Sequence, residues 1–268
     1  MKNEIVVLIT GCSTGIGRGL CKILFDKGYT VVATARNVED LKDLPASLKL
    51  LLDVTQKESI NAAINEVISR FNKIDILVNN AGSSIRGALE EITVKSAQSM
   101  FDVNVFGIIN MIQVVVPEMR KKHSGKIINI GSISGKFVQP INGAYCASKY
   151  AVEALSDALR LELNSYNIQV TVIEPGPIKT NFFKTLVNNS SDLMSNPNSC
   201  YFRFYESDAR NRKKQKLANP KEAAKAISDI IFKKRLNSRY KVAVPFAYSM
   251  ITHFPDSLKE YLMKKRHL

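Results

Sequence analysis

Short apolar runs alternate with longer amphipathic segments along most of this chain. Seven runs have the length and residue types of β-strands: 5–10, 30–35, 48–53, 74–79, 126–130, 169–174 and 240–244. Several are almost continuously apolar, as expected for strands covered on both faces. Helical patterns fit between them, from residue 16 onward and over 56–71, 93–120, 144–165 and 220–234. The alternation predicts an α/β fold: a doubly wound parallel sheet of about seven strands with helices on both faces.

The stretch 177–219 interrupts this rhythm, because it is polar in places and contains Pro197. A loop of this length inside a compact domain indicates a lid over a binding site or a disordered segment. Its large apolar and aromatic residues are Phe182, Phe183, Leu186, Met194, Tyr201, Phe202, Phe204 and Tyr205. They either line a site for a bulky lipophilic substrate or pack together to order the lid, and the sequence leaves both interpretations open.

The chain has 268 residues, which suits one domain over 1–268 with the lid at 177–219 and a C-terminal extension at 245–268. No run approaches the ~18 uncharged apolar residues of a membrane span. The four cysteines lack metal-ligand spacing, so no metal site is predicted. Because no targeting segment is visible at the N-terminus, free thiols in a reducing compartment are expected, and the predicted location is cytoplasmic.

The net charge of +14 is concentrated near the C-terminus, where residues 203–268 hold 17 Lys or Arg and 6 Asp or Glu. A solvated basic surface is the favoured interpretation, and no nucleic-acid partner is predicted. A basic rim that attracts an anionic substrate or cofactor, or a surface for an anionic membrane, is the alternative. The amphipathic end 258–266 either makes weak peripheral contact with a bilayer or packs beside a pocket or a partner subunit.

A glycine-rich loop follows the first strand and opens the first helix. Glycines at this place allow a tight turn and let backbone N–H groups approach a pyrophosphate at the positive end of the helix. The sequence therefore predicts a Rossmann-type dinucleotide site. Its loop comprises Gly11, Ser13, Thr14, Gly15, Ile16 and Gly17.

The end of the second strand indicates which dinucleotide is preferred. An NAD site usually places an acid there, whereas this chain has Ala35 followed by Arg36. A positive charge favours the 2′-phosphate of NADP, with Arg18 as a second candidate contact. Asp53 and Val54 end the third strand, where they are placed to meet the adenine; alternatively, Asp53 is only an N-cap for the next helix.

Tyr145 and Lys149 are four residues apart on a predicted helix, so they share one face. An ammonium about 5 Å from a phenol, at an effective dielectric of about 20, favours the phenolate by roughly 3 kcal/mol, or about two pKa units. Tyr145 is thus a candidate acid for carbonyl reduction and a candidate base for alcohol oxidation. The same spacing recurs at Tyr261 and Lys265, in a basic tail without a glycine loop or serine to serve it.

Taken together, these motifs resemble those of the short-chain dehydrogenase/reductase family over nearly the whole chain. The matching segments are 10–17, 79–82, Asn104, Ser132, Tyr145-x-x-x-Lys149 and 175–180. The resemblance implies a catalytic set of Asn104, Ser132, Tyr145 and Lys149. It also implies cofactor contacts by Tyr145, Lys149, Asn80, Ala81, Gly82, Pro175, Gly176, Ile178 and Thr180, and a homodimer or homotetramer.

Three functions remain in competition. The favoured one is an NADP(H)-dependent oxidoreductase that interconverts a carbonyl and an alcohol on a lipophilic small molecule of steroid, retinoid or acyl-lipid type, with NAD(H) as the less favoured cofactor. The second is a 3-oxoacyl carrier-protein reductase, which the basic surface suits but the extended C-terminal region does not. The third is a cofactor-sensing protein without turnover, which gives the Tyr145 and Lys149 pair no reason to exist.

Overall fold

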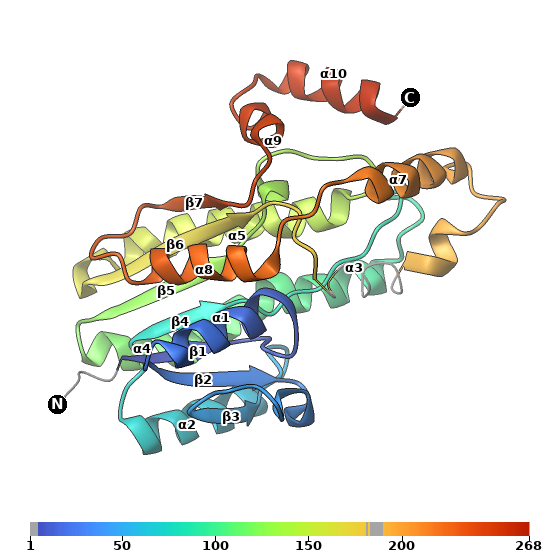
Figure 1. The fold of residues 1–268 in the computed structure, drawn as a ribbon. Helices are drawn as coiled ribbons and strands as arrows, with labels where there is room; N and C mark the ends of the chain where they lie inside the picture. The colour runs from blue at the N-terminus through green and yellow to red at the C-terminus, as the bar shows by residue number, and fades with distance from the viewer. Residues whose placement is uncertain (1–4, 181, 183–189, 268) are drawn as a thin grey trace.

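The computed structural model describes residues 5–180, 182 and 190–267. Seven strands form one parallel sheet in the order β3-β2-β1-β4-β5-β6-β7 (Figure 1). The strands are β1 (Val6–Ile9), β2 (Thr30–Ala35), β3 (Leu48–Leu51), β4 (Ile76–Asn79), β5 (Gly125–Ile130), β6 (Ile168–Pro175) and β7 (Arg239–Val242). All seven predicted strands are therefore confirmed. The strand order reverses between β1 and β4, which creates a crevice at the carboxyl ends of these strands.

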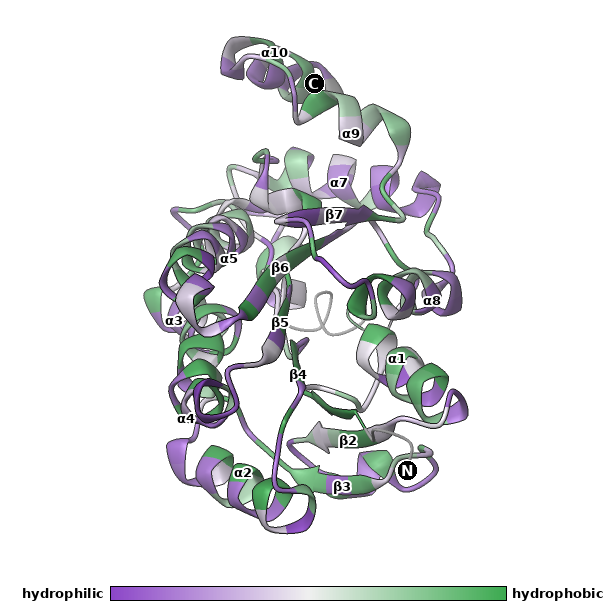
Figure 2. Cartoon of the chain, turned by 90° about the vertical axis from the view of Figure 1, so that its left-hand side faces the viewer, coloured by the Kyte–Doolittle hydropathy of each residue, from purple (hydrophilic) through white to green (hydrophobic). Residues whose placement is uncertain are grey.

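Helices cover both faces of the sheet, as predicted (Figure 2). Residues of α1 and α8 share one buried cluster with the sheet, and residues of α2, α4 and α5 share the other. These helices are α1 (Gly15–Asp26), α2 (Lys57–Phe71), α4 (Gly107–Lys121), α5 (Gly143–Glu162) and α8 (Pro220–Ile231). Short 3-10 turns occur at η1 (Val38–Leu41), η3 (Ile133–Gly135) and η4 (Asn164–Tyr166).

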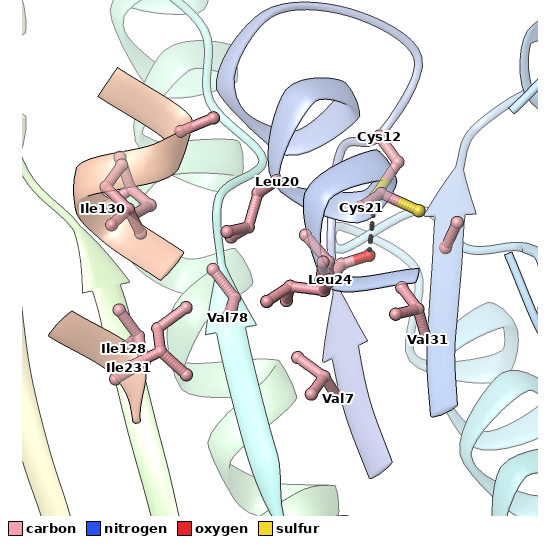
Figure 3. Close-up of a cluster of buried hydrophobic side chains, with 14 of the residues drawn as sticks. Val7, Cys12, Leu20, Cys21, Leu24, Val31, Val78, Ile128, Ile130 and Ile231 are labelled. Atoms are coloured by element: carbon pink, nitrogen blue, oxygen red, sulfur yellow. Dashed lines mark hydrogen bonds between the residues drawn. The ribbon is translucent and has the colours of Figure 1, made fainter. Parts of the chain in front are cut away.

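The core between α1, α8 and the sheet is built from small and branched apolar side chains. Leu20 and Leu24 of α1 face Val7 of β1, Val78 of β4 and Ile231 of α8, and all five are fully buried (Figure 3). Burying a side chain of this size contributes about 1.5–3 kcal/mol. This packing holds the start of α1, and with it the glycine loop, against the carboxyl edge of the sheet.

The long helix predicted over 93–120 has a break in its regular winding. It consists of α3 (Val94–Phe101), a π-helical turn η2 (Asp102–Phe106) and α4. The run Val94–Lys121 is long and apolar enough to cross a membrane, which contradicts the expectation that no segment would be. Met111 and Val115 of α4, however, are fully buried against the sheet, as in the core helix of a globular domain.

The segment 177–219 is not the loop that its sequence predicts. It contains α7 (Phe202–Lys214) and a helical stretch over 190–194. Tyr205 is 1% exposed, and its hydroxyl accepts a 3.0 Å hydrogen bond from the Ala88 amide and donates to Glu91. For Tyr205 the packing interpretation is therefore confirmed, whereas Phe183 and Leu186 lie outside the described residues.

The C-terminal extension forms α9 (Phe246–Ile251) and α10 (Asp256–His267), which lie at one end of the molecule beyond β7 (Figures 1 and 2). Met263 of α10 and Ile251 of α9 are buried against Ile133 and Phe137, which follow β5. The tail thus packs beside the substrate end of the crevice. The second Tyr–Lys pair, in α10, has Lys265 Nζ 4.9 Å from the Tyr261 ring centroid, outside the cavity.

Candidate active site

A cavity of about 560 Å³ lies at the carboxyl ends of the strands, where the strand order reverses. Nearly all the predicted site residues line this cavity, and they lie at the ends of six strands and on α5. The predicted residues that line it are Gly11, Ser13, Thr14, Gly15, Ile16, Arg36, Asp53, Val54, Asn80, Ala81, Gly82, Ser132, Tyr145, Lys149, Pro175, Gly176, Ile178 and Thr180. Two predicted residues, Gly17 and Asn104, lie behind its wall.

The glycine loop has a conformation that only glycine adopts readily. Gly11 and Gly15 have φ of +70° and +61°, in the left-handed region. A Cβ on Gly17 would lie 2.4 Å from Asn80 Nδ2 and 2.6 Å from the Gly11 carbonyl oxygen. Gly17 is therefore required for close packing beneath the loop and not for lining the cavity. The loop is free of side chains that would block a pyrophosphate at the N-terminus of α1.

The segment after β4 is tied to the end of β1 by side-chain hydrogen bonds. Thr10 Oγ1 accepts from the backbone amides of Asn80 and Ala81 at 2.9 and 3.0 Å. Asn80 Nδ2 donates to the carbonyl oxygens of Thr10 and Gly11 at 2.8 and 3.0 Å. These bonds explain how two motifs about seventy residues apart in sequence form one wall of the site. They also hold the Gly11 turn in place.

The far end of the cavity carries the groups that were expected to meet the adenosine half of a dinucleotide. Arg36 is exposed at the end of β2 and lines the cavity, while Arg18 donates a 2.9 Å hydrogen bond to the Asp40 carbonyl and does not line it. Asp53 accepts from the amide and hydroxyl of Thr55 at 2.9 and 2.8 Å. Because α2 begins only at Lys57, Asp53 is not its N-cap.

The catalytic candidates meet at the opposite end of the cavity. Tyr145 and Lys149 lie on one face of α5, with Lys149 Nζ 5.8 Å from the Tyr145 ring centroid. Ser132, directly after β5, lies close enough to the Tyr145 hydroxyl to lower the pKa of the phenol, and its Oγ accepts a 3.1 Å bond from the Ser134 amide. Lys149 Nζ donates to the Ile130 carbonyl at 3.0 Å. The three side chains line the same part of the cavity, with Ser132 and Lys149 both near the Tyr145 ring.

The expected lowering of the Tyr145 pKa by Lys149 is wrong. Burial raises the pKa of Tyr145 to about 12, and only the hydrogen bond from Ser132 and the charge of Arg86 lower it. Burial also lowers the pKa of Lys149 to about 8, against a raising effect of Glu153. The sequence argument counted the attraction between ammonium and phenolate but left out the desolvation of both groups. A phenol with a raised pKa keeps its proton at neutral pH and can serve as an acid.

Asn104 lies in the π-helical turn and is 1% exposed. Its Oδ1 accepts from the Ser83 amide at 2.8 Å, and its Nδ2 donates to the Ser83 carbonyl at 2.9 Å and to Ser148 Oγ at 3.0 Å. These bonds fix the segment after β4 onto α5, next to Tyr145 and Lys149. The catalytic role that the family resemblance implies for Asn104 stays a prediction.

The structure adds residues that the sequence did not identify. They are Asp208, Asn211 and Arg212 of α7, Gln215 directly after α7, Arg86 from the segment after β4, and Tyr248 of α9. Phe182, one of the lid aromatics for which the sequence left a substrate-lining role open, lines the cavity as well. The Phe182 ring lies 5.9 Å from the Tyr145 ring. The α7 residues and Gln215 recur at the i, i+3, i+4 and i+7 spacing of one helix face. This spacing of polar residues was present in the sequence. The segment was not predicted as a helix, because it has no matching apolar stripe on its other face.

Comparison with known proteins agrees with the motifs. The short chain dehydrogenase family model matches residues 5–191. A 3-ketodihydrosphingosine reductase from Bacteroides thetaiotaomicron is 35% identical over 264 residues, which are 97% of this chain and 96% of the relative. Human 17-beta-hydroxysteroid dehydrogenase type 1 is 34% identical over 82% of this chain and 71% of its own length.

Solved structures agree with the fold. The crystal structure of a short-chain dehydrogenase from Streptomyces avermitilis superposes with a TM-score of 0.84 at 30% identity, over 98% of this chain and 96% of that one. A serine dehydrogenase in complex with NADP+ has a TM-score of 0.77 at 26% identity, over 89% of this chain and 94% of that one. Sequence motifs, family match and fold lead to one conclusion: this chain belongs to the short-chain dehydrogenase family of oxidoreductases.

Proposed function

We propose that this protein is an NADP(H)-dependent reductase of a lipophilic ketone or aldehyde, acting on a sterol-like, retinoid-like or long-chain lipid substrate. The observation that carries the proposal is the Tyr145, Ser132 and Lys149 group at one end of a cavity whose other end is a glycine cradle. The relatives named for 3-ketodihydrosphingosine and for a hydroxysteroid support the lipid class of the substrate.

In the direction of reduction, Tyr145 is the acid. Its raised pKa, about 12, keeps the phenol protonated at neutral pH, so the hydroxyl can donate its proton to the carbonyl oxygen as that oxygen gains negative charge. Ser132, which lines the cavity beside Tyr145, can donate to the same oxygen and orient it. The positive charge of Arg86 favours the phenolate that remains.

The residues at the cradle fit a dinucleotide, which when bound would supply the hydride to the carbonyl carbon. The open turn at Gly11 and Gly15 can hold the pyrophosphate at the start of α1, and Lys149 can reach the nicotinamide ribose. Arg36 supports NADP over NAD, because it offers a cation at the end of β2, where an NAD site usually has an acid. The NADP-bound serine dehydrogenase supports the same choice.

A homodimer or homotetramer is part of the proposal. In related enzymes the interface is expected to lie on the helices predicted over 93–120 and 144–165. Exposed apolar side chains on these two segments support the proposal, since Phe106 is 51% and Leu161 is 80% exposed. A cytoplasmic location and weak peripheral membrane contact through α10 are proposed on the sequence grounds given above. A 3-oxoacyl carrier-protein reductase is the alternative substrate assignment.

The test is NADPH consumption by the purified protein with a ketosteroid, retinal, 3-ketodihydrosphingosine and an acetoacetyl thioester, with NADH in parallel. We expect turnover of at least one lipid ketone or aldehyde, faster with NADPH than with NADH. Turnover of the acetoacetyl thioester alone would support the carrier-protein alternative. Tight NADPH binding without turnover of any compound would contradict the reductase assignment and favour a cofactor-sensing role.

A further inference from the structure

A buried cluster of three charged residues, Arg86, Asp208 and Arg212, lines the substrate half of the cavity. Arg86 Nη1 bonds to Oδ1 of Asp208, and Arg212 Nε bonds to Oδ2 of the same carboxylate at 2.6 Å. The side chains of Arg86, Asp208 and Arg212 are 10%, 6% and 19% exposed. Each oxygen of Asp208 is thus already bonded to one guanidinium, so the cluster has one positive charge that Asp208 does not balance.

Among the described residues that line the substrate end of the cavity, Asp208 is the only carboxylate that can balance this charge. Among the described residues that line the cavity, only Asp53 and Asp208 are acidic, and Asp53 lies at the far end beside Thr55. The neighbours of Arg212 on the lining face of α7 are the amides Asn211 and Gln215. A buried cation without a counter-charge is costly, and protein sites of this kind are usually completed by an anion.

An unpaired donor on Arg86 also indicates that an anion binds here. Its Nε atom is buried and has no hydrogen-bond partner among the described residues. An unpaired buried N–H destabilises the folded protein, and the guanidinium fork can bind a carboxylate or phosphate with two parallel bonds. Arg86 lines the same cavity as Tyr145, and its charge lowers the pKa of the Tyr145 hydroxyl.

We propose that Arg86 and Arg212, held in position by Asp208, form an anion-binding subsite, and that the preferred substrate is a lipid ketone carrying a carboxylate or a phosphate near its carbonyl. This inference rests on the proposed reductase function and specifies its substrate. Asp208 orients the two guanidinium groups and neutralises one of their two positive charges. The other positive charge binds the anion. The same arrangement disfavours a cationic head group, because both oxygens of Asp208 are already bonded to a guanidinium.

The competing interpretation is that the cluster only fastens α7 onto the segment after β4. A fastening of this kind would make no distinction between charged and neutral substrates. Matched substrate pairs separate the two interpretations without any change in the protein. One pair is a long-chain 4-oxo carboxylic acid and its methyl ester, and the other is a long-chain 1-hydroxy-2-ketone and its phosphate monoester. A trimethylammonium ketone of the same length provides the cationic comparison.

We expect kcat/KM to be at least tenfold higher for the anionic member of one pair, with the cationic ketone the poorest substrate. The pair that shows the preference distinguishes carboxylate from phosphate. Arg212→Gln should bring that ratio close to one, with the loss falling on the anionic substrate. Arg210→Gln is the matched control, because Arg210 is exposed on the same helix and does not line the cavity; it should leave the ratio as it is.

Equal kcat/KM within both pairs would overturn the subsite while leaving the reductase function standing. An Arg212→Gln variant that loses activity equally on both members would assign the cluster to fastening α7, and an equal loss of NADPH affinity would assign it to the cofactor. Calorimetry with a long-chain alkyl phosphate, an alkyl carboxylate and the matching alcohol gives a readout without turnover. If neither anion binds more tightly than the alcohol, the proposal is wrong.

Discussion

Replacing Lys149 with Met should make the protein more stable and inactive. Lys149 is 5% exposed, and burial lowers its pKa from 10.5 to about 8. At 1.36 kcal/mol per pKa unit, keeping this ammonium charged in the folded protein costs about 3 kcal/mol near neutral pH. Lys149→Met removes that cost but also removes the 3.0 Å hydrogen bond to the Ile130 carbonyl, worth about 1 kcal/mol. We therefore expect a net stabilisation of about 2 kcal/mol.

The stability difference between Lys149→Met and the original protein should depend on pH. The pKa of Lys149 is lower in the folded protein, at about 8, than in the unfolded chain, at 10.5. Burying Lys149 therefore costs no folding free energy above pH 10.5, and the cost grows as the pH falls from there through about 8. Between about pH 7 and about pH 10 the original protein should gain roughly 2 kcal/mol relative to the variant. The advantage of Lys149→Met should therefore largely disappear at the higher pH.

Urea unfolding at the two pH values measures this difference directly. Lys225→Met is the control, because Lys225 is exposed on α8 and its replacement should have no pH-dependent effect. Turnover by Lys149→Met should be lost at both pH values. A stability difference between Lys149→Met and the original protein that is the same at both pH values, or a variant that is less stable near neutral pH, would refute the burial argument.

Two further substitutions test the cofactor end of the cavity. Arg36→Ala should raise the KM for NADPH by about 10–100-fold, because charge-assisted bonds to the 2′-phosphate are lost, and should leave the KM for NADH nearly unchanged. Lys42→Ala, a change at an exposed residue nearby, is the control. Equal effects of Arg36→Ala on both KM values would contradict the assignment of Arg36 to the 2′-phosphate. Gly17→Ala places a Cβ 2.4 Å from Asn80 Nδ2 and should weaken NADPH binding at least tenfold in a fluorescence titration. Gly28→Ala, strained at φ +81° but with open space around its Cβ, should lower stability without changing the NADPH affinity.

The sequence predicted the sheet and most of the cavity because local signals carry both. Runs such as Val6–Ile9 are apolar throughout and fit only a strand covered on both faces. The glycine loop needs specific backbone angles at Gly11 and Gly15, and these residue types reveal the requirement. The spacing of Tyr145 and Lys149 fixes their common helix face, so it predicts their proximity without a structure.

What could not be predicted depends on tertiary contacts. The pKa of Tyr145 is set by how completely the phenol is desolvated, which no spacing reveals. The π-helical turn that carries Asn104 interrupts a segment with ordinary helical periodicity. Arg86 and Asp208 lie 122 positions apart, and only the docking of α7 over the segment after β4 brings them together. The residues of the proposed anion subsite are therefore ones that the sequence did not identify.

The most direct test of the reductase assignment is Tyr145→Phe, measured as NADPH consumption with the best ketone of the panel and as NADPH affinity by titration. Removing the phenolic proton should lower kcat by roughly 10²–10⁴-fold, the usual contribution of a general acid, while the Kd for NADPH stays within about twofold. The ring keeps its packing against Phe182, so the fold should be unaffected. A variant that reduces the ketone as fast as the original protein would show that Tyr145 is not the proton donor.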